Sequence, residues 1–493
     1  MNICCVYTTD NYIAGKKPLV SLVKIPFGIS FIATSLKNSG YDVQILVITP
    51  ETDIRRTIKG YIEEHHPRLF CLTSVSSQYP LIRDIARTVR SIDDSIYLLL
   101  GGHHASLNPE ATIKEPCFDA LCIGEGEFSV VEYASQIQDG KTPSQIHNLW
   151  IRDKENGTVE QNDSHPFIQD LDGLPFMDIK MWDRWIAHTT RVAQVLIGRG
   201  CPNTCTYCSN HALAKLCGGK YVRFRSPDNI IEEINRIIID YPTVRYVRLQ
   251  AETLSINLEY TYALCDRLKE FNAGLKYPLS FQINLSPGKG LLTDKEFLYR
   301  LKSAGIDNIS IGLESGSEKV RNEILKRPRY TNRDIIDFCN LARTVGMHVK
   351  LNVLIGIPGE TLSDFQETIA CVRDCNPQHV TPFIFYPYPG TKLYNMARNM
   401  NLLSEDLVNP TAERKISRPD LPGFSKKQIQ REFILFYYHV YRGRLPFYMI
   451  AARAIREFMF IDPKINARFK KVFNYSFLRN LRHKLSTDPP HHL

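Results

Sequence analysis

The first 140 residues alternate between short apolar runs and amphipathic stretches of helical length. The stretch FGISFIATSLKNSG, residues 27–40, repeats apolar positions at helical spacing and is closed by Gly40. Continuous apolar runs typical of buried strands lie at residues 2–8, 41–48, 68–74, 95–102 and 118–127. Strands that alternate with helices predict an α/β domain over residues 1–140, a Rossmann-like doubly wound parallel sheet. Ligands of such sheets bind at the carboxyl ends of the strands.

Residues 141–190 carry the turn signals DKENG, SHPF and DLDGLPFMD, which predict a connector. A second series of strands and helices follows over residues 191–404. Its predicted strands lie at residues 193–200, 244–250, 279–285, 307–315, 348–359 and 379–390. Six βα units predict a partial (β/α)6 TIM-like barrel, in which the chemistry is placed on the loops that follow the strands.

Composition indicates a chain of two or three domains, because 493 residues are too many for one ordinary core. The hydrophobic fraction of 43% and charged fraction of 23% are those of a globular protein. Thirteen cysteines show no regular secreted framework, and the start MNICCVYTTD does not resemble a signal peptide. We therefore expect reduced thiols and a cytoplasmic location. The best candidate for a membrane span, residues 447–461, is interrupted by Arg453, Arg456 and Glu457.

The net charge of +9 is concentrated near the end of the chain, in a predicted basic helical C-terminal region, residues 405–493. Residues 414–493 hold 17 Lys plus Arg against 5 Asp plus Glu, which gives them +12. No recognised nucleic-acid-binding motif accompanies this charge, so nucleic acid is disfavoured. Apolar runs interleaved with basic residues favour peripheral association with an anionic membrane surface and a hydrophobic, lipid-like substrate. A solvated helical cap is the alternative.

The loop IGRGCPNTCTYCSN, residues 197–210, holds Cys201, Cys205 and Cys208 directly after the first predicted barrel strand. A structural zinc site needs four protein ligands, and neither His211 nor Cys217 completes one at suitable spacing. Three thiolates can hold three irons of a [4Fe–4S] cluster and leave the fourth iron open for substrate. The spacing C-x3-C-x2-C therefore predicts a catalytic cluster, with a zinc site or a chance trio as the alternatives.

These motifs resemble the radical S-adenosylmethionine (SAM) enzymes. The resemblance covers the middle of the chain through GRGCPNTCTYC, IGLESGSEKVRNEILKR, LIGIPGET and YPYPGTKLY. It implies that the open iron binds SAM and that an electron, supplied by a donor such as flavodoxin or ferredoxin, splits SAM into methionine and a 5′-deoxyadenosyl radical. It also implies SAM contacts, with Tyr207 near the adenine, Glu314 and Ser315 near the ribose or methionine part, and Ile355 and Gly356 beside the adenine. A structural carboxylate is the alternative for Glu314.

The first domain resembles the cobalamin-binding domain that precedes the barrel in one large subgroup, through PFGISFIATSLKNSGYDV, GGHHASLNPE and IGEGE in that order. Many such domains carry D-x-H-x-x-G, whose histidine binds cobalt, but here Tyr12 stands in the place of that histidine. Tyr12 is a candidate replacement ligand, with chance spacing as the alternative. His103, His104, Gly124 and Glu125, at predicted strand ends, are candidates to approach cobalamin, and loop histidines facing water are the alternative for the first two.

The resemblance implies cobalamin-dependent radical SAM chemistry, with methylation of an unactivated carbon as the leading reaction. Cobalamin-assisted radical cyclisation or oxidation, as in the anaerobic porphyrin-ring cyclases, is the alternative reaction. A cluster-bearing sensor or binding module without turnover is an alternative of another class. Glu252, after the second predicted barrel strand, is the candidate catalytic acid–base group or contact to the SAM amine. The expected cofactors are therefore a [4Fe–4S] cluster, SAM and cobalamin.

Overall fold

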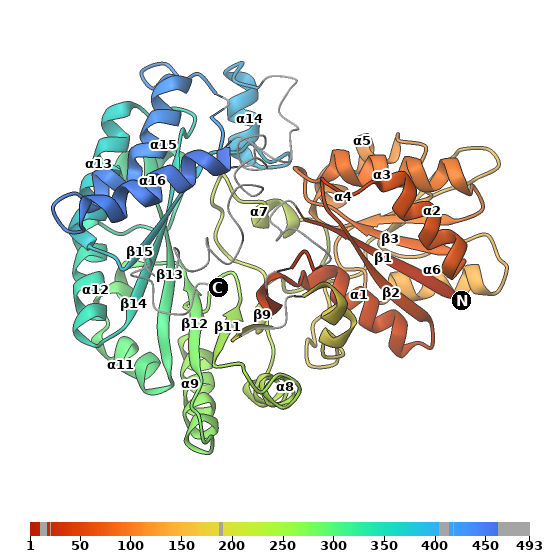
Figure 1. The fold of residues 1–493 in the computed structure, drawn as a ribbon, viewed down its shortest axis with the longest axis horizontal. Coiled ribbons are helices and arrows are strands. Elements are labelled where there is room, and N and C mark those ends of the chain that lie inside the picture. The colour runs from red at the N-terminus through yellow and green to blue at the C-terminus, as the bar shows by residue number, and fades with distance from the viewer. Residues whose placement is uncertain (10–16, 20, 187–190, 404–413, 418, 462–493) are drawn as a thin grey trace.

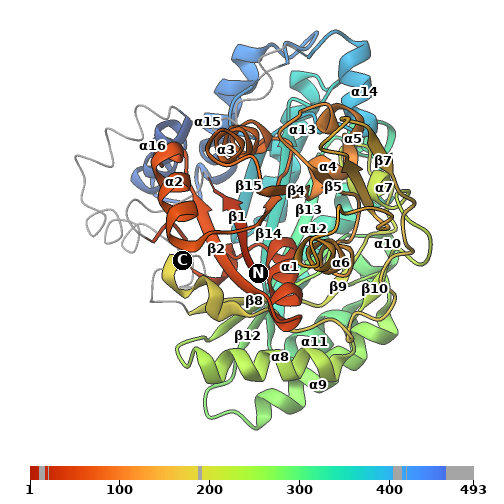
Figure 2. The same cartoon turned by 90° about the vertical axis from the view of Figure 1, so that its right-hand side faces the viewer.

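The described part of the chain forms two large sheets that lie side by side, with a pair of C-terminal helices against the second (Figures 1 and 2). The computed structural model describes residues 1–9, 17–19, 21–186, 191–403, 414–417 and 419–461. The predicted candidate Tyr12 and the last part of the basic tail lie outside the described residues.

The first sheet has seven strands in the order β2-β1-β3-β4-β5-β6-β7. Its first five strands run parallel, and β6 pairs antiparallel with both of its neighbours, β5 and β7. The strands are β1 (Asn2–Thr8), β2 (Asp42–Ile48), β3 (Leu69–Thr73), β4 (Tyr97–Gly101), β5 (Ala120–Cys122), β6 (Leu149–Arg152) and β7 (Val159–Gln161). Its helices are η1 (Leu22–Lys24), α1 (Phe27–Asn38), α2 (Ile54–His65), α3 (Tyr79–Ile92), α4 (His103–Leu107), α5 (Pro109–Ile113) and α6 (Ser129–Gln138).

The second sheet is the partial barrel that the sequence predicts, with six parallel strands in the order β15-β14-β13-β12-β11-β8. The strands are β8 (Val192–Leu196), β11 (Tyr246–Gln250), β12 (Ser280–Leu285), β13 (Ile306–Glu314), β14 (His348–Ile355) and β15 (His379–Ile384). The helices between them are α8 (Pro227–Asp240), α9 (Leu258–Ala273), α10 (Lys289–Thr293), α11 (Lys295–Ser303), η3 (Val320–Ile324), α12 (Asn332–Thr344) and α13 (Leu362–Cys375). A short hairpin of β9 (Gly198–Arg199) and β10 (Arg223–Phe224) flanks α7 (Asn210–Leu213).

Alternation along the barrel strands separates an apolar outer face from a polar inner face. In β12, Phe281, Ile283 and Leu285 are buried, and the residues between them are partly exposed. The strand β14 repeats this alternation. Because successive side chains in a strand point to opposite faces, the apolar residues pack against the helices and the polar ones line the barrel interior.

The predicted connector is an integral part of the packing between the two sheets. It contributes β6 and β7 to the edge of the first sheet and then the 3-10 helix η2 (Ile179–Trp185). Trp182 is fully buried against Tyr7, and the Trp185 indole donates to the carbonyl of Ile45. One apolar cluster continues from the first sheet into the barrel wall. Sequence reasoning missed both strands because runs of three or four residues are too short for their alternation to stand out.

The helix α14 (Lys392–Asn399) follows β15 and ends the predicted barrel region, and the C-terminal region holds α15 (Lys426–Tyr441) and α16 (Phe447–Ile461). A capping box of Ser425 and Gln428 starts α15, which packs against α13 and β15. At its other end, Arg373 donates to the carbonyls of His439 and Val440, so a cation satisfies the last turn. None of the described helices is long and apolar enough to cross a membrane.

Candidate functional site

The cysteine loop follows β8 and begins at the hairpin of β9 and β10. Gly200, directly before Cys201, has φ +88°, and a Cβ atom there would overlap the carbonyl oxygen of Tyr221. Only glycine combines that backbone conformation with so close an approach. The sequence Gly-Cys therefore fixes the direction in which the loop leaves the strand and enters the mouth of the barrel.

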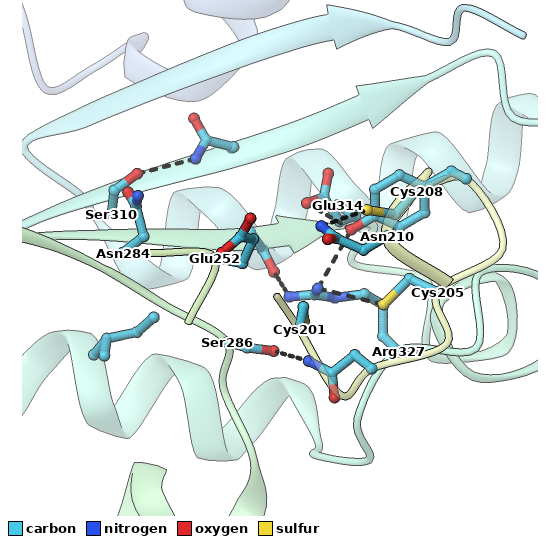
Figure 3. Close-up of a pocket in the computed structure, with 15 residues that line it drawn as sticks. Cys201, Cys205, Cys208, Asn210, Glu252, Asn284, Ser286, Ser310, Glu314 and Arg327 are labelled. Carbon is cyan, nitrogen blue, oxygen red and sulfur yellow. Dashed lines mark hydrogen bonds between the residues drawn. The ribbon is translucent and has the colours of Figure 1, made fainter. Parts of the chain in front are cut away.

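All three predicted cluster cysteines line one cavity of about 240 Å³ at the carboxyl ends of the barrel strands (Figure 3). The cavity is otherwise lined mainly by polar side chains, with one tyrosine and one leucine. Besides the three cysteines, the lining residues are Asn203, Tyr207, Asn210, Glu252, Asn284, Leu285, Ser286, Ser310, Gly312, Glu314, Arg327 and Asn352. The barrel mouth thus brings the three thiols together with amide, hydroxyl and carboxylate groups.

The donor set fits a [4Fe–4S] cluster. Within the described ranges, no group of three or more His, Cys, Asp or Glu side chains could hold a single metal ion. A cluster needs a different arrangement, because each thiolate binds a separate iron. Burial raises the pKa of Cys201 to about 11 and raises the pKa of Cys208, so both thiols are protonated near neutral pH until iron replaces the proton.

Two side chains in the cavity donate hydrogen bonds to cysteine sulfurs (Figure 3). The Asn210 amide nitrogen lies 3.5 Å from Cys208 Sγ, and Nη1 of Arg327 lies 3.7 Å from Cys205 Sγ. Sequence reasoning missed both residues. Asn210 stands only two positions after a cysteine, but Arg327 is 122 residues from Cys205 along the chain and reaches it from the segment after η3.

Glu314 ends β13 in a left-handed backbone conformation, with φ +63°, where the register to β14 shifts. This geometry turns its carboxylate back over Gly312, where a Cβ atom would overlap Glu314 Oε1. The Tyr207 hydroxyl donates to that oxygen at 3.0 Å, and Arg327 Nη1 lies 3.3 Å from the same hydroxyl. A strained residue whose side chain is aimed into a cavity is typical of a functional site.

A layer of amides and hydroxyls crosses the barrel interior beside the cysteines. Asn284 donates to Gln250 at 3.0 Å and Asn352 donates to Ser310 at 3.1 Å. These residues were also missed. Their signal is the alternation in FQINL and HVKLNVL, where polar side chains recur at every second position of strands that are otherwise apolar.

The structure places Glu252 in the same cavity, and it places three other predicted SAM contacts outside it. Ser315 is fully buried and lies 3.3 Å from Thr368 of α13. Ile355 ends β14 with no exposure, and Gly356 approaches Ile429 of α15. The turn at Gly356 is held by Glu360, which accepts the N–H groups of Gly356 and Ile357. The predicted contacts of Ser315, Ile355 and Gly356 with SAM stay predictions.

The predicted cobalamin residues lie at the carboxyl edge of the first sheet, which faces the cysteine loop. The helix α4 contacts α7, and Gly390, after β15, approaches Leu107. His103 is exposed, whereas His104 is buried, stacks on Tyr79 with ring centroids 3.9 Å apart, and has its pKa lowered to about 4 by burial. His104 is therefore neutral near pH 7.

This edge fits a ligand rich in amide groups. Among the described residues, Thr8 Oγ1, at the end of β1, and His104 Nε2 are buried without a hydrogen-bond partner. Orphaned polar atoms at a sheet edge are suited to a polar ligand, and cobalamin carries amide side chains around its ring. Thr8 carries no sequence signal of its own. Tyr12, the candidate ligand to cobalt, lies outside the described residues.

Glu125 takes part in an ion-pair network that joins the two parts of the chain. Its carboxylate accepts from Arg223 at 2.9 Å through both oxygens and from Arg199 at 2.9 Å. Arg199 also pairs with Glu127 at 2.6 Å. The predicted role of Gly124 and Glu125 in binding cobalamin stays a prediction. Residues 124–127, GEGE, are held through Arg199 to β9, the strand that leads into Cys201.

Two family matches follow the same order as the two sheets. Residues 20–134 match the B12 binding domain, and residues 195–372 match the Radical SAM superfamily. The chain is 26% identical over 390 residues to an uncharacterized methyltransferase of Pyrococcus horikoshii, covering 78% of this chain and 81% of that protein.

Two further relatives differ in their reactions. The chain is 24% identical to the anaerobic magnesium-protoporphyrin IX monomethyl ester cyclase of Rubrivivax gelatinosus, covering 75% of this chain and 65% of the cyclase. It is 23% identical to the hopanoid C-3 methylase of Methylococcus capsulatus, covering 84% of this chain and 77% of the methylase.

Two solved structures share the fold over most of the chain. The cobalamin-dependent SAM radical enzyme OxsB superposes with a TM-score of 0.65 at 15% identity, covering 97% of this chain and 75% of OxsB. The radical SAM methyltransferase TsrM of Kitasatospora setae gives a TM-score of 0.62 at 17% identity, covering 82% of this chain and 75% of TsrM.

Proposed function

The chain belongs to the radical SAM enzymes that carry an N-terminal cobalamin-binding domain, and on that premise we propose that it methylates an unactivated carbon. The observation that carries the proposal is the single cavity at the barrel mouth that Cys201, Cys205 and Cys208 share with polar side chains. Methyltransferases among its relatives favour methyl transfer over other radical reactions.

Cys201, Cys205 and Cys208 would hold the cluster, which supplies the electron that splits SAM into methionine and a 5′-deoxyadenosyl radical. The carboxyl edge of the first sheet would hold cobalamin, which supplies the methyl group. That edge faces the cysteine loop through α4 and α7, so one substrate carbon can reach both cofactors.

The protein's own residues would position SAM in this cavity. Glu314 presents a carboxylate, held by Tyr207, to the cationic part of SAM, and the layer of Asn284, Ser310 and Asn352 offers amides and hydroxyls to its polar groups. Glu252 lines the same cavity and is exposed, so it is placed to exchange a proton with a bound substrate or to contact the SAM amine.

The decisive experiment incubates the reconstituted protein with SAM, cobalamin and either a chemical reductant or a reduced flavodoxin or ferredoxin. We expect 5′-deoxyadenosine together with S-adenosylhomocysteine, and loss of 5′-deoxyadenosine in Cys205→Ala. Formation of 5′-deoxyadenosine without S-adenosylhomocysteine, even in the presence of extracts that contain substrate, would favour the cyclase-type reaction that the Rubrivivax relative suggests. A cluster-loaded protein that forms neither product would be a sensor or binding module.

Cobalamin binding is tested separately from turnover. The protein purified with added cobalamin is expected to retain cobalt and the absorbance of the corrin. If cluster-loaded, folded protein binds no cobalamin, the first domain has kept its fold and lost its ligand.

We further propose peripheral association with anionic membranes and a lipid-like substrate. The corner between α15 and α16 exposes Phe447 and Tyr448, 72% and 64% accessible, beside exposed Arg442 and Arg444. Aromatic rings next to basic side chains suit the interface of an anionic bilayer, where each basic residue contributes about 1 kcal/mol. The hopanoid methylase among the relatives is consistent with a lipid substrate. Arg453, Arg456 and the later lysines are also predicted to contribute to membrane binding. Their side chains lie outside the part of the chain that the structure describes.

Flotation with anionic and neutral liposomes tests this association. We expect binding to anionic liposomes at low salt, weakened by high salt and by the double substitution Phe447→Ser and Tyr448→Ser. If the protein does not bind anionic liposomes even at low salt, the helix pair is a solvated cap. Comparing the metabolites and lipids of a deletion strain with those of its parent would identify the substrate.

A further inference from the structure

We propose that Arg327 and Asn210 set the reduction potential of the cluster by donating hydrogen bonds to two of its three cysteine sulfurs. The inference rests on the proposed function, because it concerns the cluster that Cys201, Cys205 and Cys208 would hold. It assigns these two side chains a positioning and electrostatic role that the cysteine motif does not contain.

Arg327 is held so that its donor cannot turn away from the sulfur. One arm of the guanidinium, Nη1, lies 3.7 Å from Cys205 Sγ and 3.3 Å from the Tyr207 hydroxyl, and the other arm donates to the carbonyl of Gly312. Because the guanidinium is planar and both arms are bound, the direction of the N–H group toward Cys205 is fixed.

Asn210 is oriented by a second side chain in the same way. Its amide oxygen lies 2.5 Å from the hydroxyl of Tyr221, which donates to it, and its amide nitrogen lies 3.5 Å from Cys208 Sγ. In this orientation the NH₂ group faces the sulfur, and the oxygen that faces away is held by the tyrosine hydroxyl. Among the described side chains, none donates to Cys201, which receives only the backbone N–H of Asn203.

Reduction adds one electron to the cluster, and part of the added charge falls on the cysteine sulfurs. Hydrogen bonds to the sulfurs stabilise the reduced state more than the oxidised state and raise the potential. Arg327 adds a full positive charge at the same place, partly offset by Glu314, which interacts with it electrostatically. The Arg327 donor is therefore expected to have a larger effect than the neutral Asn210 donor.

The test is an EPR-monitored redox titration of the reconstituted protein in the absence of SAM. We expect Arg327→Gln to shift the midpoint potential to a more negative value, Asn210→Leu to shift it less in the same direction, and Arg327→Lys to retain part of the wild-type value. The matched control is Arg329→Gln. Arg329 stands two residues after Arg327 and is exposed, and the substitution removes the same charge. Its potential should equal that of the wild type.

Iron and sulfide contents separate a failure of the proposed function from a failure of the tuning proposal. If the wild-type protein assembles no [4Fe–4S] cluster, both the proposed function and the tuning proposal are wrong. If Arg327→Gln and Asn210→Leu carry normal clusters at the wild-type potential, the tuning proposal is wrong and the function stands. Should Arg327→Gln fail to load a cluster, an unchanged potential in Asn210→Leu alone overturns the proposal for that donor, and a negative shift supports it.

Discussion

Glu125 and Arg223 form a two-pronged ion pair, with both carboxylate oxygens 2.9 Å from guanidinium nitrogens. Glu125 belongs to the corner after β5 in the first domain, and Arg223 belongs to β10 beside the cysteine loop. The pair is largely buried, with side-chain exposures of 14% and 5%. The corner of one sheet is thereby fixed against the loop that holds the three predicted cluster cysteines of the other.

Glu125→Gln should destabilise the join between the two sheets. The substitution removes the charge that Arg199 and Arg223 share, and leaving a buried charge without its partner costs about 3 kcal/mol. We expect the free energy of unfolding to fall by that order in a denaturant titration, and cobalamin retention to weaken. Glu155→Gln, at an exposed turn, is the control and should leave both unchanged. Wild-type stability in Glu125→Gln would mean that the ion pair of Glu127 and Arg199 is enough to hold the two sheets together.

Each of the three cysteines should be needed for the cluster. Replacement of Cys201, Cys205 or Cys208 by alanine is expected to remove most of the iron and all SAM cleavage, because two thiolates cannot retain the cluster. Cys217→Ala, outside the cavity lining, is the matched control and should keep its iron. Wild-type iron content and cleavage in all three variants would rule out the assignment.

Gly200→Ala should disturb the entry to the cysteine loop. The added methyl group would overlap the carbonyl of Tyr221 at a backbone conformation, φ +88°, that costs an L-residue about 1–3 kcal/mol before the overlap is counted. We expect lower thermal stability and reduced iron content. Gly218→Ala, where nothing lies within 4 Å of the added Cβ, should behave as the wild type. Normal iron content in Gly200→Ala would show that the loop can relax.

Glu360 should make the stability of the barrel depend on pH. Burial is the main cause that raises its pKa from 4.5 to about 8, and Asp364 adds to the shift, while the N–H groups of Gly356 and Ile357 oppose it. Between these two pKa values the folded state keeps the proton and the unfolded state loses it. Stability therefore falls as pH rises from about 4.5 to about 8.

Glu360→Gln keeps the accepting oxygen and carries no charge, so the fall in stability between about pH 4.5 and 8 should become shallower. Denaturant unfolding at several pH values measures the slope. The control is Glu367→Gln. Glu367 is exposed on α13, which begins two residues after Glu360, and its variant should retain the wild-type slope. An unchanged slope in Glu360→Gln would mean that the carboxyl group ionises normally.

The periodicity of apolar residues along the chain was sufficient to predict the main architecture. The five parallel strands of the first sheet and the six of the barrel lie where continuous or alternating apolar runs predict them, because each strand must bury its apolar face against helices. It was insufficient for β6 and β7. Register pairs Leu121 with Trp150 across the sheet edge, a contact between distant segments that no local pattern specifies.

The sequence by itself predicted the three cysteines as cluster ligands, and it determined the order of the two domains. The cysteines are close along the chain, so local spacing alone brings them together, and the family motifs keep their order. Only the tertiary structure decided which polar groups meet them. Arg327 reaches Cys205, and Glu125 reaches Arg223, because parallel strands bring distant loops to one edge and because Glu314 and Gly200 adopt left-handed backbone conformations. Such contacts depend on strand register and on direction in space, and neither is encoded in the separation of residues along the chain.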